Sequence, residues 1–367
     1  MKLTIRQGKM IIVSWIIFLV GFYLFIGYLG SIQLYQNKME SLKRHQDRTD
    51  PHRTEEGKTQ VDLETLKEYN TDNYNKVYTG IYVDRIVKIS TKETSWTVDF
   101  YIWFKWEGND IDPGKTFQVI DGEFLSKTKA GEFINNNNHY VLYRVISRIT
   151  KFFNIVRYPL DNHMLVIRIE DRDHNWNVLR YVPDERSAEY SSRVNVPGYQ
   201  LKEAELVSKP HAYKTRRGDP RLPVDHQAIY SQIVYGVKME RPDWGLYFKM
   251  FQGLFASVAI AIVAFSFGPM SSDRVSLGIG AFFASVASSY INLHELPGVG
   301  LVTMTDIANG MGMITILLTL MGSIISARIV KDPSQYAIAV KLDHASLIVF
   351  LLGYISTNIA IALSASV

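Results

Sequence analysis

"RVSLGIGAFFASVASSYINLHELPGVGLVTMTD", residues 274–306, is the stretch that decides how the C-terminal part of the chain folds. It contains an uncharged run from Val275 to Leu293, then Leu296-Pro297, two glycines and Thr-Met-Thr-Asp. Because a proline disrupts helix continuation, Leu296-Pro297 is expected to end one helix. A side chain within Thr303–Asp306 is expected to cap the next helix, whose N-terminus favours a negative charge. The stretch therefore predicts a tight helical hairpin.

Other uncharged runs of similar length lie on both sides of this hairpin. An α-helix needs about 20 apolar residues to cross the hydrocarbon core of a bilayer. Residues 31–244 contain no such run. The sequence predicts five membrane spans, at Met10–Gly30, Met250–Met270, Val275–Leu293, Ile307–Ala327 and Ala345–Val367.

The basic residues suggest an orientation for these spans. Lys2, Arg6 and Lys9 precede the first span, and cytoplasmic segments carry an excess of Lys and Arg. We expect residues 1–9 in the cytoplasm, residues 10–30 as an anchor helix and the C-terminus outside. A cleaved signal peptide is the alternative, although its apolar run is normally shorter.

The polar region between the first two spans has two parts. Residues 31–75 are charged and predict a solvated, partly helical stalk or linker. Residues 76–242 contain short segments rich in aromatic and β-branched residues, separated by turn signals such as "DPG" and "NNNN". In "SWTVDFYIWFKWEG" (95–108) the large apolar residues alternate, which predicts one buried strand face: Trp96, Val98, Phe100, Ile102, Phe104 and Trp106.

The fold class that follows is an α+β membrane protein. It has an N-terminal transmembrane helix, an extracellular antiparallel β-sandwich of roughly ten strands, and a C-terminal four-helix transmembrane bundle at residues 243–367.

Composition excludes several classes of function. The chain has 367 residues, a net charge of +4 and no cysteine. Disulfides, thiolate catalysis and Cys-based metal sites are therefore excluded. No histidine pair has metal-motif spacing, and no nucleotide-binding or hydrolase motif occurs. We expect no catalytic residues, no metal, no cofactor and no nucleic-acid partner, so the chain is not predicted to be an enzyme.

Taken in order, the motifs resemble the pentameric ligand-gated ion channels, the Cys-loop receptor superfamily, in their prokaryotic cysteine-free branch. "VDFYIWFKW" (98–106) looks like the second strand of that family, and Tyr158-Pro159-x-Asp161 looks like the centre of its signature loop. "MERPDWGLYF" (239–248), with Arg241, resembles the strand-to-helix junction, and the run that ends at Leu296-Pro297 resembles the pore helix. The N-terminal helix and stalk depart from the family pattern.

The resemblance implies a homopentamer with a pore that conducts cations. A helix that faces a central axis presents residues three and four apart. The predicted pore-lining residues are Ser276, Gly280, Phe283, Ala287, Tyr290 (or Ile291) and His294. Phe283 would form a gate that closes by dewetting, and a ring of Asp273 would concentrate cations. The alternatives are that small residues only allow close helix packing and that Asp273 is an ordinary loop charge.

Family likeness also implies a surface that couples ligand binding to the pore. Tyr158, Pro159, Asp161 and Arg241 would face Leu296 and Pro297 and pass the strain of binding to the pore helix. The alternative is a plain outer loop with a capped helix.

Agonists in the family bind between subunits, under a hairpin that here would be Lys214–Ala228. Aromatic side chains attract cations or stack on rings, although each can equally serve strand packing. The predicted ligand-binding residues are Trp176, Tyr213 and Tyr230, with Tyr101 and Trp103 from the neighbouring subunit. Arg216, Arg217 and Arg221 would suit an acidic ligand, while "IEDRDH" (169–174) could bind a divalent cation or sense protons. The agonist class stays open between a small molecule, a proton and a divalent cation.

A second function fits the same architecture: a membrane-anchored β-sandwich sensor or scaffold that conducts no ions. The cytoplasmic loops are too short for an output domain, which favours the channel. Either protein is expected in a bacterial inner membrane, with the sandwich facing the periplasm or the exterior.

Overall fold

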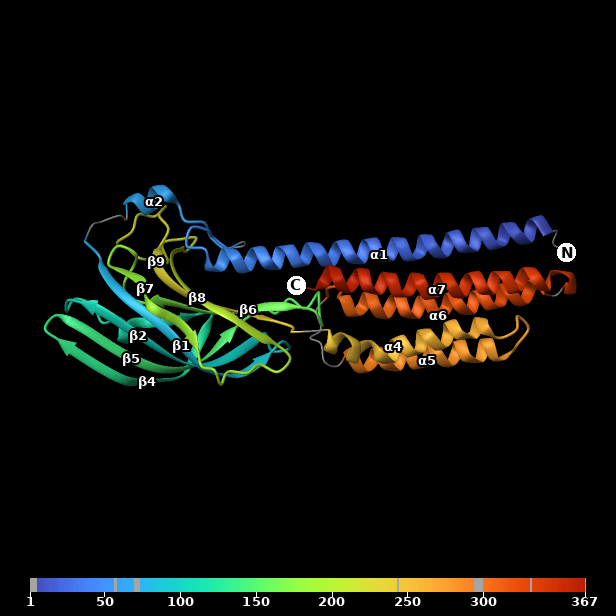
Figure 1. Ribbon diagram of the computed structural model, residues 1–367. Helices are drawn as coiled ribbons and strands as arrows, with labels where there is room; N and C mark the ends of the chain where they lie inside the picture. The colour runs from blue at the N-terminus through green and yellow to red at the C-terminus, as the bar shows by residue number, and fades with distance from the viewer. Residues whose placement is uncertain are drawn as a thin grey trace. The chain divides into compact units, whose positions relative to one another are not determined.

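A computed structural model describes residues 5–55, 58–68, 73–242, 244–293, 300–330 and 332–366. The chain divides into two compact units, each coloured by residue number in Figure 1. The helical unit comprises Met1–Met39, Asn154–Asp161 and Asp243–Val367, and the sheet unit comprises Glu40–Phe153 and Asn162–Pro242. The loop 154–161, which separates two strands in sequence, therefore belongs to the helical unit.

Two sheets form the sheet unit (Figure 1). The five-stranded sheet has the order β4-β5-β2-β1-β7, with β1 at Asn75–Ser90, β2 at Ser95–Glu107, β4 at Gly122–Asn135, β5 at Asn138–Thr150 and β7 at Leu179–Tyr190. The four-stranded sheet has the order β3-β6-β9-β8, with β3 at Phe117–Ile120, β6 at Asn162–Asp171, β8 at Gln200–Ala212 and β9 at Ile229–Glu240. Two short helices complete the unit, α2 at Leu63–Glu68 and α3 at Pro113–Thr116.

The hydrophobic core lies between the two sheets. Trp96, Val98, Phe100, Ile102, Phe104 and Trp106 are all buried, as the alternation in β2 predicts. Phe104 meets Phe117 of the other sheet, with ring centroids 5.1 Å apart. The predicted β-rich domain is confirmed, with one difference: β1 and β7 pair in parallel, and the other strand pairs are antiparallel.

The first helix is longer than its predicted span. α1 runs from Ile5 to Thr49, and its residues beyond Met39 belong to the sheet unit. There Ser41 Oγ donates to Asn162 Oδ1 at 3.3 Å, and Lys209 Nζ donates to the Asp47 carbonyl at 2.9 Å. The first part of the predicted stalk is thus a helix packed on the four-stranded sheet.

Four more helices form the rest of the helical unit, and they run antiparallel in sequence order. Gly253, in the middle of the first, faces Ser288 in the last third of the second, and Gly312 of the third faces Leu254. Glycine at these points allows a close approach. The helices are α4 at Gly245–Val263, α5 at Asp273–Leu293, α6 at Met304–Ile329 and α7 at Tyr336–Ala365, with 3₁₀ turns at Ala264–Ser266 and Pro333–Gln335.

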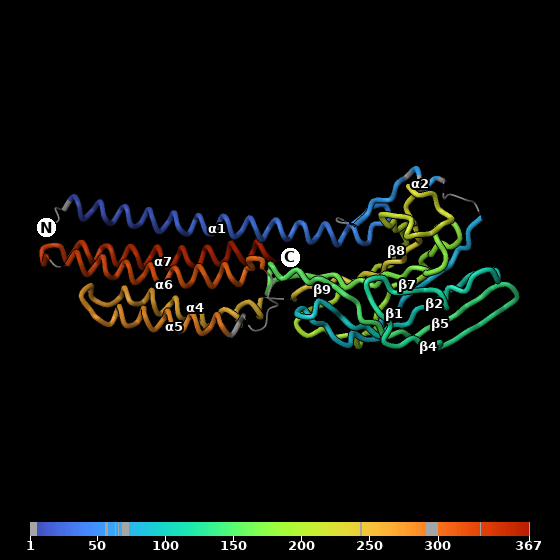
Figure 2. Tube along the Cα trace, turned by 180° about the vertical axis from the view of Figure 1, so that it is seen from behind, coloured from blue at the N-terminus to red at the C-terminus, as the bar shows by residue number. Residues whose placement is uncertain are grey.

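Within the helical unit, α1 lies alongside α7 and parallel to it, as both views show (Figures 1 and 2). Gly8 faces Ile338 near the start of α7, and Gly30 faces Ile361 near its end. Trp15 Nε1 donates to Ser346 Oγ at 3.1 Å, and the hydroxyls of Tyr23 and Thr315 lie 3.1 Å apart. α1 is therefore a packed member of this unit.

Among the described residues, four helical segments are long and apolar enough to cross a membrane: Arg6–Thr49, Gly245–Ser266, Met304–Ile329 and Pro333–Ala365. The fifth predicted span, α5, has 21 residues and is less hydrophobic than α4, α6 and α7. Its serines, glycines and alanines replace the aliphatic residues of the other spans.

Candidate functional site

The outward face of α5 differs in chemistry from the outward faces of its neighbours. One side of α5 packs against α4 and α6, and it carries Arg274, Gly278, Ala281, Ser285 and Ser289, all buried. At about 100° per residue, the directly opposite side carries the predicted pore-lining residues. Every one of them that the structure describes is exposed: Ser276, Gly280, Phe283, Ala287 and Tyr290.

Exposure is large for the two aromatic residues on this face. Phe283 is 68% exposed and Tyr290 is 64% exposed, although phenylalanine is usually buried and tyrosine is often partly buried. Val275, Ile279 and Val286 flank this face on one side. By contrast, apart from Tyr336 at the start of α7, the exposed large hydrophobic residues of α6 and α7 are aliphatic or methionine: Ile314, Leu317, Met321, Ile324, Ile348, Leu351, Leu352, Ile355, Ile359 and Leu363. Those two helices present a surface suited to lipid, whereas the outward face of α5 combines the small residues Ser276, Gly280 and Ala287 with two aromatic side chains.

The first turn of α5 separates two opposite charges. Asp273, the predicted selectivity residue, is exposed and accepts a hydrogen bond from Ser271 Oγ at 3.2 Å. Arg274 points into the bundle, where its Nη2 lies 2.9 Å from Oδ1 of Asp343 on α7. Its Nε also donates to the Ala264 carbonyl at 3.1 Å. The carboxylate is thus left on the outer surface, and the neighbouring cation is neutralised inside.

Asp343 is a residue that the sequence analysis missed. It is one acidic residue in an otherwise apolar helix pattern, and it is only 2% exposed. A buried charge requires a partner, so its position in the helix could have signalled an ion pair, but not the identity of the partner.

Loop 154–161 docks onto the end of the bundle where α6 begins and α7 ends. The Met304 amide donates to the Val156 carbonyl at 2.7 Å, and Thr305 Oγ1 donates to the Tyr158 carbonyl at 3.2 Å. Arg157, buried and also missed by the sequence analysis, donates from Nη1 to the Ala365 carbonyl at 2.8 Å. A cation there suits the negative end of the α7 dipole.

Capping fixes the start of α6. Thr303 is the N-cap, with its hydroxyl accepting from the Asp306 amide at 3.3 Å and the Asp306 carboxylate accepting from the Thr303 amide at 2.8 Å. This reciprocal pair is a capping box, so the predicted capping function of this stretch is confirmed.

The other predicted coupling residues have different locations. Pro159 and Asp161 are buried and belong to the helical unit together with Tyr158. Arg241 belongs to the sheet unit, where its guanidinium lies 3.7 Å from the centre of the Tyr199 ring and donates to the Gly198 carbonyl at 3.0 Å. His294, Leu296 and Pro297 lie outside the described residues.

Three of the five predicted ligand-binding aromatics gather around the loop between β8 and β9. Tyr213 and Tyr230 meet edge to face, with ring centroids 5.7 Å apart, and the Arg217 guanidinium lies 4.3 Å from the Tyr213 centroid. Trp176 packs at the base of the same loop, against the cluster of Ala212 and Ile229.

The other two aromatics lie on β2, in the five-stranded sheet. Arg144 lies 5.5 Å from the centre of the Tyr101 ring, and Trp103 Nε1 donates to Asp184 at 2.8 Å. Tyr101 and Trp103 thus lie on a different sheet from Tyr230, which belongs to β9.

Behind Tyr213 lies a buried polar network that the sequence analysis missed. Glu170 is fully buried and accepts hydrogen bonds from the Tyr213 hydroxyl at 2.8 Å and from Gln232 Nε2 at 2.7 Å. His211 Nδ1 also contacts its carboxylate. The carboxylate fixes the position of Tyr213, and burial together with this carboxylate raises the pKa of Tyr213.

The neighbouring acidic loop contains a second carboxylate–histidine contact. His174 Nδ1 lies 2.8 Å from Asp171 Oδ1, and this contact raises the pKa of His174. Within the part of the chain that the structure describes, no group of three or more His, Asp or Glu side chains could hold a metal ion.

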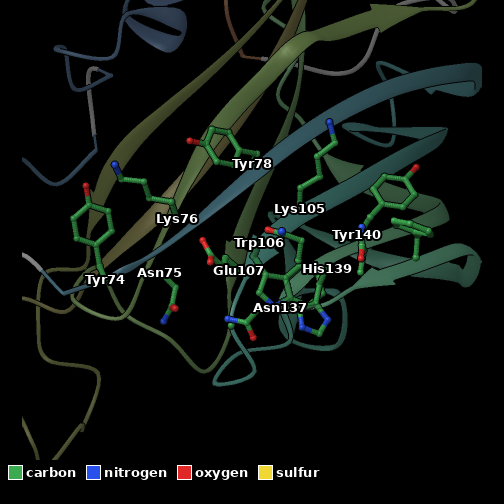
Figure 3. A pocket seen from close by; sticks show the side chains of 14 residues that line it. Tyr74, Asn75, Lys76, Tyr78, Lys105, Trp106, Glu107, Asn137, His139 and Tyr140 are labelled. Carbon is green, nitrogen blue, oxygen red and sulfur yellow. The ribbon is translucent and has the colours of Figure 1, made fainter.

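A hollow in the sheet unit has a lining separate from these aromatics. It has a volume of about 670 Å³ and is formed by the start of β1, the end of β2 and the β4–β5 turn. Figure 3 shows Tyr74, Lys76, Tyr78, Lys105 and His139 around it. Trp106 lines it as well, stacked on His139 with ring centroids 4.9 Å apart. None of the predicted ligand-binding residues lines this hollow.

Comparison with known proteins adds no family to this picture: the sequence matches no family model, and no curated protein is significantly similar to it. What the structure supports is an architecture compatible with pentameric ligand-gated channels, namely an N-terminal apolar helix, a β-sandwich-like region and C-terminal apolar helices.

Proposed function

We propose that this chain forms a homopentameric ligand-gated ion channel that selects cations, in which ligand binding to the sheet unit opens a pore lined by α5. The observation that carries the proposal is the outward face of α5. Ser276, Gly280 and Ala287 face away from the bundle, exactly opposite the packed side, on the least hydrophobic of the long C-terminal helices. Small residues and a serine, interrupted by Phe283 and Tyr290, suit a narrow pore with an apolar constriction.

Charge at the start of α5 supports cation selection. Asp273 is exposed, and Arg274 is neutralised by Asp343 inside the bundle. Five copies of Asp273 around an axis would concentrate cations at the mouth. Phe283, about three turns further along α5, would form the apolar constriction.

The contacts of loop 154–161 support a route from ligand to pore. Tyr158 and Val156 carbonyls are held by Thr305 and Met304 at the start of α6. Movement of this loop would act on α6 directly, and on α5 through Leu296-Pro297. Arg241 would complete the coupling surface.

Orientation follows from the basic residues. Lys9, Arg274, Arg328 and Lys341 all fall at the end of the bundle where α5 and α7 begin. By the positive-inside rule this end would be cytoplasmic in a bacterial inner membrane, with the sheet unit and the C-terminus outside.

The test is an ion-flux assay with purified protein in liposomes under asymmetric salt, scanned over pH and divalent cations. Phe283→Ala is expected to conduct without added agonist. Asp273→Lys is expected to move the reversal potential away from the equilibrium potential of the permeating cation. The packed-face variant Ser285→Ala is the control for both. A pentamer by mass in which Phe283→Ala carries no current would refute the proposed gate, and a chain with neither flux nor a pentamer would be the sensor or scaffold.

A further inference from the structure

A short stretch near the N-terminus of the sheet unit lies against the β8–β9 loop, residues 213–228. We call residues 60–66 the latch segment. The side chain of Gln227, in the loop, makes two hydrogen bonds to its backbone. Gln227 Oε1 accepts from the Asp62 amide at 3.1 Å, and Gln227 Nε2 donates to the Gln60 carbonyl at 3.2 Å. One side chain therefore links the loop to the segment through a donor and an acceptor.

Apolar contacts reinforce this link. Val61 and Leu66 pack onto the buried pair Ala212 and Ile229, the residues at the two ends of the loop. Ala212 is 1% exposed and Ile229 is fully buried. Leu222, from within the loop, packs on the same cluster. The latch segment thus covers both strand ends from which the loop emerges.

The latch segment also touches the predicted ligand site. Trp176 belongs to the same apolar cluster, and its amide donates to the Ile229 carbonyl at 2.9 Å. Tyr213 and Tyr230 directly flank Ala212 and Ile229 in sequence. A ligand that contacts these aromatics would therefore meet a loop that the latch segment already holds.

Upstream of the latch segment, the chain is tied firmly to the four-stranded sheet. Glu55 is held between Arg48, at 2.6 Å, and Arg168 of β6, at 2.8 Å. Lys209 Nζ donates to the Arg53 carbonyl at 3.2 Å as well as to Asp47. This anchor fixes where the latch segment begins.

The hydrogen bonds between the latch segment and the loop lie at the surface. Both bonds of the Gln227 side chain are exposed, and the apolar side chains beside them, Val61 and Leu66, are only partly buried. Contacts of this kind open at lower free energy than a sheet does. The anchor can stay in place while the latch segment releases the loop.

We propose that residues 60–66 are a built-in latch that holds the β8–β9 loop in one position, so that release of this contact is part of the response to ligand. The link to the pore rests on the proposed channel function, whereas the holding of the loop does not. The latch is an autoinhibitory contact: ligand binding that moves the loop has to break it.

Hydrogen exchange on the full-length protein tests the holding role directly. In Leu66→Ala/Gln227→Ala, exchange of amides in residues 213–228 and of the Trp176 amide is expected to rise about tenfold, the effect of losing hydrogen bonds of this kind. Exchange in β2 is expected to stay unchanged. The control is Val224→Ala, since Val224 is 74% exposed in the same loop. Equal protection in the double variant and the wild type would overturn the latch.

Crosslinking tests the link to the pore. Because the chain has no native cysteine, only the introduced cysteines can react. Asp62→Cys/Gln227→Cys is placed in the chain with Phe283 intact, and flux is recorded at the pH and divalent-cation concentration that give the largest current. A reducible bifunctional thiol reagent that joins the two cysteines is expected to lower the flux at least about twofold and a reductant to restore it, while either single cysteine variant stays unaffected. A crosslink that forms by mass and leaves flux unchanged would overturn the regulatory role. No flux from Phe283→Ala would count against the channel alone, and hydrogen exchange would still decide the latch.

Discussion

Arg274 and Asp343 form a buried ion pair across two helices, with Nη2 of the arginine 2.9 Å from Oδ1 of the aspartate and both side chains at most 3% exposed. They are far apart in sequence, yet the pair joins the first turn of α5 to the first half of α7. It turns the arginine away from the outward face and leaves Asp273 as the charge at that end of α5.

Breaking this pair on one side is expected to destabilise the protein strongly. Asp343→Asn leaves the Arg274 charge buried without its partner, which typically costs about 3–5 kcal/mol. Thermal unfolding of the purified protein in detergent measures the loss. Lys341→Gln, an exposed site on the same helix, is the control and should melt like the wild type. The apolar double variant Arg274→Met/Asp343→Leu should recover much of the loss. Wild-type melting of Asp343→Asn would contradict the prediction.

Cysteine reactivity along α5 distinguishes water, lipid and protein as its surroundings. Because the chain has no cysteine, single cysteines can be introduced without altering the background. A charged thiol reagent needs a thiolate exposed to water. Ser276→Cys, Gly280→Cys and Ala287→Cys are expected to react and to lose flux on modification, whereas the packed-side Ser285→Cys and Ser289→Cys should not.

Leu352→Cys on α7 controls for lipid exposure, because Leu352 is 62% exposed and belongs to an aliphatic face. It should stay unreactive. Equal labelling of Ser276→Cys and Ser285→Cys would show that the outward face of α5 is no more exposed to water than its packed side.

Thr305 is expected to control how firmly loop 154–161 is held. Its side chain is fully buried, and its hydroxyl donates to the Tyr158 carbonyl at 3.2 Å. Thr305→Val keeps the shape and loses the donor, which typically costs about 1 kcal/mol. Faster hydrogen exchange in residues 154–161 is the expected signature. Thr305→Ser retains the hydroxyl and should retain protection, and an unchanged exchange pattern in Thr305→Val would show that this bond contributes nothing.

His174 is expected to give the protein a pH-dependent contribution to stability. The Asp171 contact raises its pKa above the ordinary 6.5, so the folded state binds the proton more tightly than the unfolded chain. The contribution is therefore complete below pH 6.5 and is lost as the pH rises through the pKa of the folded state. His174→Asn should lack this step when unfolding is compared with wild type from pH 5 to pH 9. If stability changes with pH in the same way in wild type and in His174→Asn, His174 makes no pH-dependent contribution.

Much of the secondary structure could be predicted because it depends on local pattern. Alternation in residues 95–108 predicted the buried face of β2, and uncharged runs predicted long helices. Thr303 and Asp306 are three residues apart, which is the spacing that a capping box needs, so the start of α6 could be predicted as well. The helical stripe on α5 was also predictable, since i, i+3 and i+4 spacing alone sets which residues share a face.

The candidate site shows the limit of local pattern. The predicted aromatics Trp176, Tyr213 and Tyr230 do gather at one loop, but the residues that hold them come from distant segments. Glu170 was not predicted, because a glutamate in a strand gives no sign of which side it faces until the sheet pairing is known. The latch segment lay within a stretch interpreted as solvated stalk.

The sequence by itself determined which segments are helix or strand, which helix faces could be buried and which end of the helices is basic, because periodicity, proline and charge act over a few residues. Only the tertiary structure decided that Arg274 meets Asp343, that loop 154–161 binds the start of α6, and that residues 60–66 cover the β8–β9 loop. Those contacts join residues far apart in the chain, and they depend on the packing of whole sheets and helices, which no single stretch encodes.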